Sequence, residues 1–288
     1  MNQASEQASE HLVRLDDVVK HIRDLPTLPA IAQEMLNNLD DEDSSMDSIT
    51  EKIAMDISLT AKILRLANST YYGANSRVVT LQQATAMLGM KNVKNLIRMT
   101  ILTNNFPASG CPAFDFPGFW RHSIATAVCA ELISRALHMK HDFAFTAGLL
   151  HDIGRLVLVT CFPQEYSEVL AYRKLNDCHL LDAERAVMQV DHVAAGLALA
   201  TQWHFSDAVC DTIRGHHQPE TEGLNSLASV VHVANSIVHA LDLSGEEDDL
   251  APLLSQLAWD TLGLSESEYL AIFRETEMRF AALNDIVH

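Results

Sequence analysis

The sequence has no uninterrupted apolar run of 18 or more residues, although apolar residues make up 48% of its 288 positions. Residues 1–24 also lack the charged and then apolar pattern of a secretory leader. Because a membrane-spanning helix needs about 20 apolar residues in succession, neither a membrane span nor a signal peptide is indicated. We therefore expect a cytoplasmic protein that has no membrane partner.

Cysteine is scarce and scattered. The five cysteines include no C-x-x-C pair, and their number is odd. Both facts argue against a disulfide framework and against a zinc site made of thiolates. We interpret the cysteines as small core or boundary residues, at Cys111, Cys129, Cys161, Cys178 and Cys210.

Basic residues are few. The chain has 20 Lys and Arg against 38 Asp and Glu, which gives a formal net charge of −18. A chain of this charge repels polyphosphate backbones, so direct binding to nucleic acid is not expected. Lys91, Lys94 and Arg98 form a short basic row at helical spacing, but such a row is more typical of a solvated helix face than of a phosphate groove.

Stretches in which apolar and polar residues alternate, as they do in β-strands, are missing as well. We therefore predict an all-α fold in which an N-terminal helical bundle packs on a second helical lobe. Residues 106–118 hold three of the eight prolines and two of the 11 glycines, so we predict that they form the loop between the lobes. Residues 244–250 are predicted to be a solvated acidic linker to two last helices. The predicted division is residues 1–21 as an N-terminal extension, 22–110 as the first lobe, 111–243 as the second lobe and 244–288 as C-terminal helices.

The stretch FTAGLLHDIGR at residues 145–155 is the most informative part of the sequence. Its apolar residues recur at helical spacing, and Gly154 is predicted to stop the helix just after a polar pair, His151 and Asp152. Adjacent side chains on a helix point about 100° apart, so the two cannot both bury in one apolar seam without a reason. A metal ion is one such reason, because an imidazole nitrogen and a carboxylate oxygen suit iron, manganese or zinc. The alternative is that His151 is a hydrogen-bonded core histidine and that Asp152 caps the next segment.

The HDIG tetrapeptide at residues 151–154 resembles the signature of the HD superfamily of metal-dependent phosphohydrolases. The LPTLPA segment at residues 25–30 is similar to the LPxLP opening of HDOD domains. Residues 57–69 are similar to the DPxLxxxxLxxANS segment of the same family, with Ile57 where a proline is usual. The resemblance extends over about residues 22–241. It implies an HDOD domain, which is a non-catalytic relative of the HD-GYP cyclic dinucleotide phosphodiesterases.

The same resemblance implies a set of ligands for two metal ions. Six residues stand at the ligand positions of the HD-GYP relatives, namely His122, His151, Asp152, His192, His216 and His217. Asn235 stands where the catalytic relatives carry aspartate, and a neutral amide binds a hard cation weakly. Arg155 stands in place of their usual lysine, and an Arg fork is not equivalent to an ammonium group. The segment that follows the His pair reads QPE at residues 218–220 and does not resemble the Gly-Tyr-Pro motif.

These departures favour a bacterial-type signal transduction protein that acts by binding a protein or a ligand through a degenerate HD metal site, without turnover. The partners we expect are a signalling protein and, at the site, a nucleotide or phosphoester. The cofactor we expect is a divalent metal ion, which is iron, manganese or zinc.

The alternative is an active metal-dependent phosphohydrolase, either a phosphodiesterase or a nucleotide phosphohydrolase, with Asp152 and Arg155 as its catalytic residues. Two-metal hydrolysis needs both ions in place to activate a water and to clamp a phosphate. In this alternative one ion is held by His122, His151 and Asp152, and the other by His192, His216 and His217.

Overall fold

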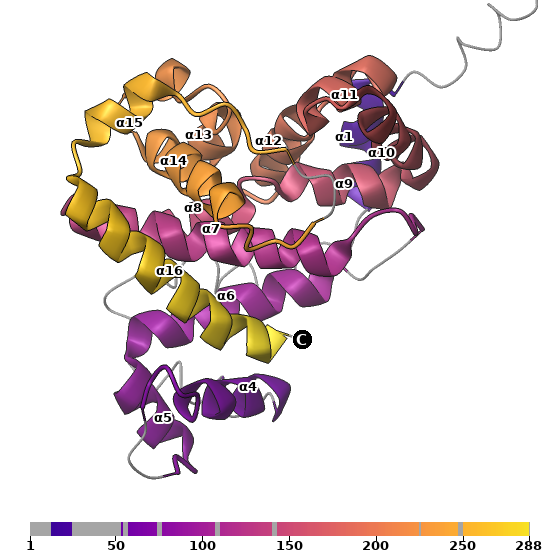
Figure 1. Cartoon of the computed structure of the whole chain (residues 1–288). Coiled ribbons are helices and arrows are strands. Elements are labelled where there is room, and N and C mark those ends of the chain that lie inside the picture. The colour runs from indigo at the N-terminus through magenta and orange to yellow at the C-terminus, as the bar shows by residue number, and fades with distance from the viewer. Residues whose placement is uncertain are drawn as a thin grey trace, which may run out of the picture.

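The computed structural model describes residues 13–24, 53, 57–73, 77–106, 110–139, 143–224, 226–246 and 250–287. Within these ranges every regular element is a helix and none is a strand, which confirms the all-α prediction (Figure 1). The LPTLPA segment, one of the two stretches that carry the HDOD resemblance, lies outside the described residues.

A long helix, α7 (Phe116–Ala136), runs through the middle of the molecule and is buried over most of its length (Figure 1). Asp115 caps its N-terminus by accepting a hydrogen bond from the Gly118 backbone N–H at 3.0 Å, and a proline lies in its first turn. Because of this cap and this proline, the helix begins at Phe116, whereas the sequence predicted a start at Phe119 and a loop up to residue 118. Helices α8, α14 and α16 all pack along α7.

Two groups of helices lie on one side of α7 (Figure 1). One group comprises α8 (Ala144–Leu150), α13 (Asp207–Gly215), α14 (Leu227–Ala240) and α15 (Gln256–Leu262). The other comprises α9 (Ile153–Cys161), α10 (Pro163–Asn176), α11 (Leu180–Val187) and α12 (His192–Gln202). Helix α1 (Leu15–Asp24) packs against α9 and α12.

The remaining helices lie on the opposite side of α7 (Figure 1). They are α4 (Ile57–Ala67), α5 (Leu81–Leu88) and α6 (Met90–Asn105). The last helix, α16 (Glu266–Val287), packs on both α7 and α4 and so joins the two parts of the molecule. A short 3-10 helix, η2 (Pro219–Glu222), connects α13 to the segment before α14.

The helix predicted over residues 145–155 is broken at its polar pair, because His151 and Asp152 form a turn between α8 and α9. The prediction that Gly154 stops a helix is wrong, since Gly154 lies in the first turn of α9. A Cβ atom at Gly154 would overlap the carbonyl oxygen of His192. The missing side chain therefore allows α9 and α12 to approach closely, and this approach brings His192 to the polar pair.

One apolar segment, Ala144–Cys161, is long and apolar enough to cross a membrane. In this fold it consists of the two helices α8 and α9, and 89% of it is buried inside the protein. The core helices of a soluble protein meet the same criteria of length and composition. We therefore interpret this segment as part of the core.

The segment after α14 is more buried than its acidic sequence predicts. Arg121 Nε donates a hydrogen bond to the carbonyl oxygen of Ser244 at 2.6 Å, and Ser244 is 3% exposed. The Glu246 side chain is 9% exposed and forms an ion pair with Arg155. The prediction of a solvated linker over residues 244–250 is therefore wrong for Ser244 and Glu246, because Ser244 has a polar partner on α7 and Glu246 has one on α9.

The five cysteines are all free thiols. Cys111 and Cys129 are buried, and the other three are partly buried. These positions confirm the interpretation of the cysteines as core or boundary residues.

Candidate metal centre

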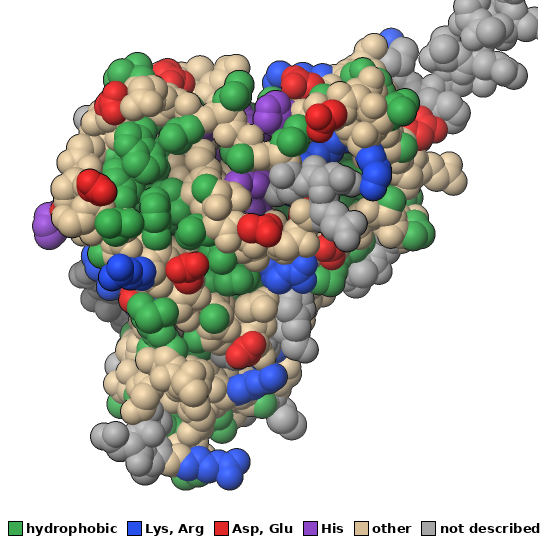
Figure 2. Space-filling view, viewed as in Figure 1, with side chains coloured by type: hydrophobic (Ala, Val, Ile, Leu, Met, Phe, Trp, Pro, Cys, Tyr) green, Lys and Arg blue, Asp and Glu red, His purple; other side chains and the backbone are tan. Residues whose placement is uncertain are grey.

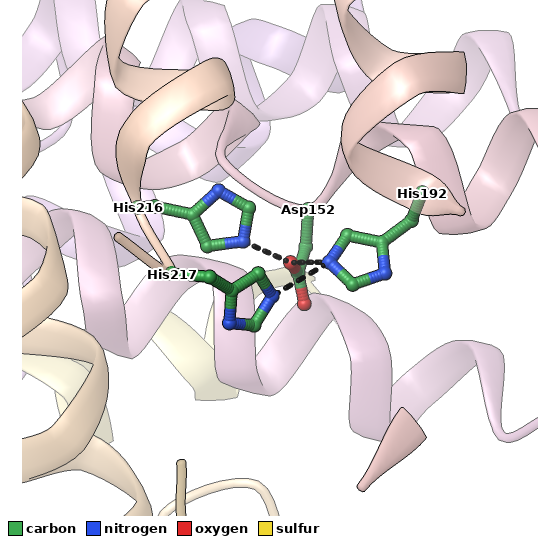
Figure 3. Close-up of side chains that lie close together, drawn as sticks. All are labelled: Asp152, His192, His216 and His217. Atoms are coloured by element: carbon green, nitrogen blue, oxygen red, sulfur yellow. Dashed lines mark hydrogen bonds and ion pairs between the residues drawn. The ribbon is translucent and has the colours of Figure 1, made fainter. Parts of the chain in front are cut away.

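The six predicted ligands meet in one place, although they come from separate parts of the chain. They lie on α7 (His122), at the junction of α8 and α9 (His151 and Asp152), in the first turn of α12 (His192) and just after or at the end of α13 (His216 and His217). Two groups have ligand atoms within 4.8 Å of one another: Asp152, His192, His216 and His217 in one, and His122, His151 and Asp152 in the other. Figure 3 shows the first group. Asp152 belongs to both groups, so its carboxylate lies at the centre of the site.

Backbone carbonyls at helix ends fix the rings of His151 and His216. His151 Nδ1 lies 2.7 Å from the carbonyl oxygen of Gly148, and His216 Nδ1 lies 2.9 Å from that of Ile213. Since a carbonyl only accepts, each Nδ1 carries a proton, which leaves Nε2 as the nitrogen of each ring that can bind a metal. These two Nε2 atoms lie 3.7 and 3.3 Å from Asp152 Oδ1.

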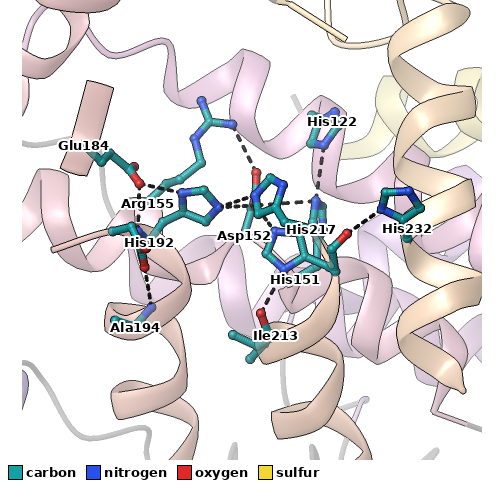
Figure 4. Close-up of polar contacts among 12 residues, drawn as sticks. His122, His151, Asp152, Arg155, Glu184, His192, Ala194, Ile213, His217 and His232 are labelled. Atoms are coloured by element: carbon teal, nitrogen blue, oxygen red, sulfur yellow. Dashed lines mark hydrogen bonds and ion pairs between the residues drawn. The ribbon is translucent and has the colours of Figure 1, made fainter. Parts of the chain in front are cut away.

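A fully buried carboxylate, Glu184 on α11, fixes the ring of His192 (Figure 4). Its Oε2 accepts hydrogen bonds from His192 Nδ1 at 2.6 Å and from the His192 backbone N–H at 2.8 Å. Its Oε1 accepts a hydrogen bond from the Tyr166 hydroxyl at 3.0 Å. Burial alone would lower the pKa of His192, but Glu184 and then Asp152 raise it to about 9. This carboxylate and histidine pair is the arrangement that commonly orients a metal-binding histidine.

The sequence analysis missed Glu184. A signal was present, because Leu180, Ala183, Glu184 and Val187 follow the i, i+3, i+4, i+7 spacing of a buried helix face. An acidic residue on such a face needs a partner in the core, and this one has two.

The electrostatics of the site favour an ionised aspartate beside one protonated ring, His192, and two uncharged rings, His151 and His217. Burial by itself would raise the pKa of Asp152, but His151, then His192 and the other neighbours hold it well below its ordinary value. Burial lowers the pKa of His151 to about 4, and burial also lowers the pKa of His217. Imidazole nitrogens and a carboxylate anion form a donor set that suits a transition metal or zinc, and binding through His192 would release its proton.

The arrangement of lone pairs fits a bound cation. His216 Nε2 is buried and makes no hydrogen bond, although it lies 3.3 Å from a carboxylate oxygen of Asp152. His192 Nε2 and His217 Nε2 are 2.9 Å apart, and His122 Nε2 and His151 Nε2 are 3.4 Å apart. Buried polar atoms are normally satisfied, and a cation would satisfy several acceptors at once.

Asn235, which the sequence analysis matched by resemblance to an aspartate of the HD-GYP phosphodiesterases, lies inside the site. It is 3% exposed on α14, and its Oδ1 makes no hydrogen bond. Together with Asp152, His192 and His217 it lines a cavity of about 260 Å³. The Asn235 amide is therefore part of the site itself.

Two histidines of α14, which were not predicted as site residues, contact two of the predicted ligands. His232 Nδ1 donates a hydrogen bond to the backbone oxygen of His216 at 2.7 Å, and its Nε2 accepts one from the Ser255 N–H at 2.9 Å. The ring of His239 lies against that of His122, with centroids 4.6 Å apart. We infer that His232 positions the residues that follow α13.

Arg155 lies beside the cluster and is held on three sides. One NH group lies 3.4 Å from Asp152 Oδ2 and the other lies 3.3 Å from Glu246 Oε2. Its guanidinium carbon lies 5.6 and 5.4 Å from the ring centres of Phe114 and Phe119, within the range of a cation–π contact.

An all-helical fold that closes several histidines around an HD pair agrees with the resemblance to the HD superfamily. A sequence model of the HDOD domain matches residues 25–219, which is most of the chain. The chain belongs to the HDOD domain family.

Solved structures agree with this fold. An HDOD domain protein of unknown function from Geobacter sulfurreducens superposes with a TM-score of 0.78 at 24% identity, over 95% of this chain and 97% of that chain. A protein from Marinobacter aquaeolei VT8, named as a suggested signal transduction protein, gives a TM-score of 0.73 at 22% identity, over 99% of this chain and 65% of that chain. A protein from Shewanella amazonensis SB2B, named as a suggested phosphohydrolase, gives 0.66 at 24% identity, over 90% of this chain and 98% of that chain.

Among curated proteins, an uncharacterized protein of Treponema pallidum (strain Nichols) is 27% identical over 232 residues. The match covers 78% of this chain but 44% of that protein. The chain thus spans less than half the length of this relative.

Proposed function

We propose that this chain is a cytoplasmic regulatory protein that binds a divalent metal at the His and Asp cluster and passes on a signal by binding a partner. The observation that supports metal binding most directly is the convergence of buried Nε2 atoms on Asp152 in two groups. The donor set suits iron, manganese or zinc. The cavity of about 260 Å³ beside the cluster is where a nucleotide or phosphoester would reach the metal.

Three features of the site argue against turnover. Asn235 supplies a neutral oxygen where the catalytic relatives carry an anion, which weakens the hold on a hydrolytic metal. The 3-10 helix Pro219–Glu222 occupies the position after the His pair, where the resemblance places the Gly-Tyr-Pro segment. Arg155 is already engaged by Asp152 and Glu246.

Elemental analysis of protein purified without chelator tests the metal. We expect close to stoichiometric iron, manganese or zinc, and a loss of that metal in His151→Ala. His21→Ala is the matched control, because His21 is exposed on α1 and belongs to neither ligand group. Substoichiometric metal together with unchanged stability of His151→Ala would show that the cluster is not a metal site.

An active phosphohydrolase is the second candidate, and the retention of both ligand groups favours it. Purified protein with added manganese and a cyclic dinucleotide distinguishes the two candidates. We expect little or no turnover. Robust turnover would overturn the regulatory proposal, whereas slow turnover that rises in Asn235→Asp would support an eroded active site.

The partner surface we propose lies where α4–α6 meet the helices around the cluster. Helix α7 carries His122 and also packs on α16, which reaches α4, so a change at the cluster has a route to this surface. A ligand shifts such an arrangement only by the difference in its affinity for the two states. Hydrogen exchange with and without manganese is the test: changes that reach residues 59–102 support coupling, and changes confined to the surroundings of His151 contradict it.

A further inference from the structure

Three adjoining cavities meet at one arginine next to the metal cluster. Arg173 on α10 lines cavities of about 570, 260 and 400 Å³, and it is 8% exposed. Arg155 lines the first two of these cavities, and Glu246 lines the first and the third. The two arginines and this one glutamate therefore lie around a common space that opens toward the cluster.

The cavity beside the cluster is rich in cations although the chain carries a net charge of −18. Among the described residues its lining includes Arg155, Arg173 and Arg185, against Asp152 and Asp182. Arg185 is also paired with Asp191, at 2.9 Å. The space-filling view shows Lys and Arg side chains near histidines at the hollow between the two upper groups of helices (Figure 2). A cavity lined with cations on an acidic protein selects an anion, because the rest of the surface repels it.

A carboxylate from the same chain already occupies part of this cationic space. Glu246 lies 91 positions from Arg155 in the sequence, yet its Oε2 is 3.3 Å from the Arg155 NH2. The Glu246 side chain packs against Gly118 of α7, where a Cβ would overlap its Cγ. The Glu246 N–H donates a hydrogen bond to the Ser244 hydroxyl at 3.2 Å, and Arg121 Nε holds the Ser244 carbonyl at 2.6 Å. Residues 244–246 are thus fastened to α7 and α9 by a small number of polar contacts.

We propose that Arg155 and Arg173 form a subsite for a phosphate group, and that Glu246 is a built-in competitor which the phosphate displaces. This inference rests on the proposed function, since the phosphate belongs to the ligand of the metal cavity. A guanidinium binds phosphate with two parallel hydrogen bonds, and a phosphate monoester carries more charge than a carboxylate. Displacement of Glu246 releases residues 244–246 from α7, and this release is the conformational signal of ligand binding.

Calorimetric titration of the full, manganese-loaded chain with inorganic phosphate tests the competitor. We expect Glu246→Gln to bind phosphate about fivefold more tightly than the wild type. In the wild type only the molecules in which Glu246 has left Arg155 can bind phosphate, and this lowers the apparent affinity. The exposed Glu266→Gln on α16 makes the same change in net charge and is expected to leave the Kd unchanged. Equal Kd values for Glu246→Gln and the wild type would overturn the competitor.

The subsite itself is tested with Arg173→Gln, for which we expect roughly tenfold weaker binding, the usual loss for a charge-assisted contact. Arg274→Gln, an exposed substitution on α16, is the matched control. A phosphate Kd that is unaffected by Arg173→Gln would contradict the subsite. Adenosine monophosphate is titrated in parallel: tighter binding than inorganic phosphate identifies a phosphoester as the ligand, and equal binding identifies free phosphate.

Hydrogen exchange separates this inference from the metal proposal. In the wild type, phosphate is expected to speed amide exchange in peptides that contain residues 244–246. In Glu246→Gln the same peptides are expected to exchange fast even without phosphate. The titrations are repeated on chelator-treated protein to see whether the phosphate Kd of Glu246→Gln still differs from that of the wild type. If the two phosphate Kd values still differ in protein with no metal, the subsite is supported even where the metal proposal fails. If the protein binds metal but the two Kd values are equal, only the subsite is overturned.

Discussion

Two buried carboxylates, Glu131 and Asp152, have partners of different kinds. Their side chains are 2% and 11% exposed. Glu131 is met by permanent cations, with Arg279 NH2 at 3.1 Å from its Oε2 and Lys91 Nζ at 3.1 Å from its Oε1. Asp152 is met by one arginine, Arg155, and by three imidazoles.

The difference indicates which of the two acids is structural. Ammonium and guanidinium groups stay charged, so the Glu131 network of α6, α7 and α16 is complete without an ion. The imidazoles around Asp152 can instead lose a proton, and together with the carboxylate they can then bind a cation. His122 and Glu131 lie nine positions apart on α7, which at about 100° per residue places them on opposite faces. One central helix therefore carries a structural network on one face and the candidate metal centre on the other.

The largest effect is expected on the structural side. Glu131→Gln leaves Arg279 buried without its anion, so we expect the free energy of unfolding to fall by about 3–5 kcal/mol, as measured by denaturant titration. Glu277→Gln, an exposed change on α16, should stay within about 0.5 kcal/mol of the wild type. Metal content should be unchanged in both variants. Loss of metal in Glu131→Gln, at a temperature where this variant is folded, would show that the Glu131 network and the metal centre are not independent.

Removal of the charge of Asp152 should act on metal binding. We expect Asp152→Asn to weaken manganese binding about 100-fold, or about 2.7 kcal/mol, because this carboxylate is shared by both ligand groups. Asp182→Asn is the control, since Asp182 lines the same cavity but belongs to neither group. Titration of metal-stripped protein with manganese measures both. Equal losses in the two variants would mean that general charge, and not ligation, holds the metal.

The support behind His192 should matter less than a ligand. Glu184→Gln keeps an oxygen that accepts from His192 Nδ1 but loses the negative charge, so we expect roughly tenfold weaker metal binding, at the low end for such supporting residues. Glu168→Gln on the exposed side of α10 is the matched control. A merely structural role would lower stability and leave the manganese Kd of the folded protein unchanged.

Several residues of the cluster lie at places that the sequence signals locally. The HD pair follows an apolar helix, and His192 follows Asp191, which caps α12 by accepting from the Ala194 N–H at 2.9 Å. Helix signals of this kind are local in the chain. The six predicted ligands lie close together in the structure, and their role as metal ligands stays a prediction.

The features that sequence analysis missed depend on contacts between distant elements. The role of Gly154 is set by its approach to the backbone of α12, and no pattern around Gly154 records that neighbour. The Glu131 network pairs α7 with Arg279, 148 positions away. Glu246 was assigned to a solvated linker because charge runs are usually exposed, but Arg155 recruits it into the core.

The smallest effect expected is the pH dependence of the Glu131 network. Burial would raise the pKa of Glu131, but Arg279 and Lys91 lower it below its ordinary value. A carboxyl group with a lowered folded-state pKa adds stability above its unfolded pKa of about 4.3, and this stability is lost as the pH falls toward the folded value. The gap in unfolding free energy between wild type and Glu131→Gln should therefore be constant from pH 7 to pH 6 and shrink by at most about 0.7 kcal/mol at pH 4. Metal-stripped protein is used so that metal release does not contribute, and the other titrating groups cancel between the two proteins. A gap that widens on acidification would mean that Glu131 is protonated more readily in the folded state, which would contradict the assignment of permanent cations as its partners.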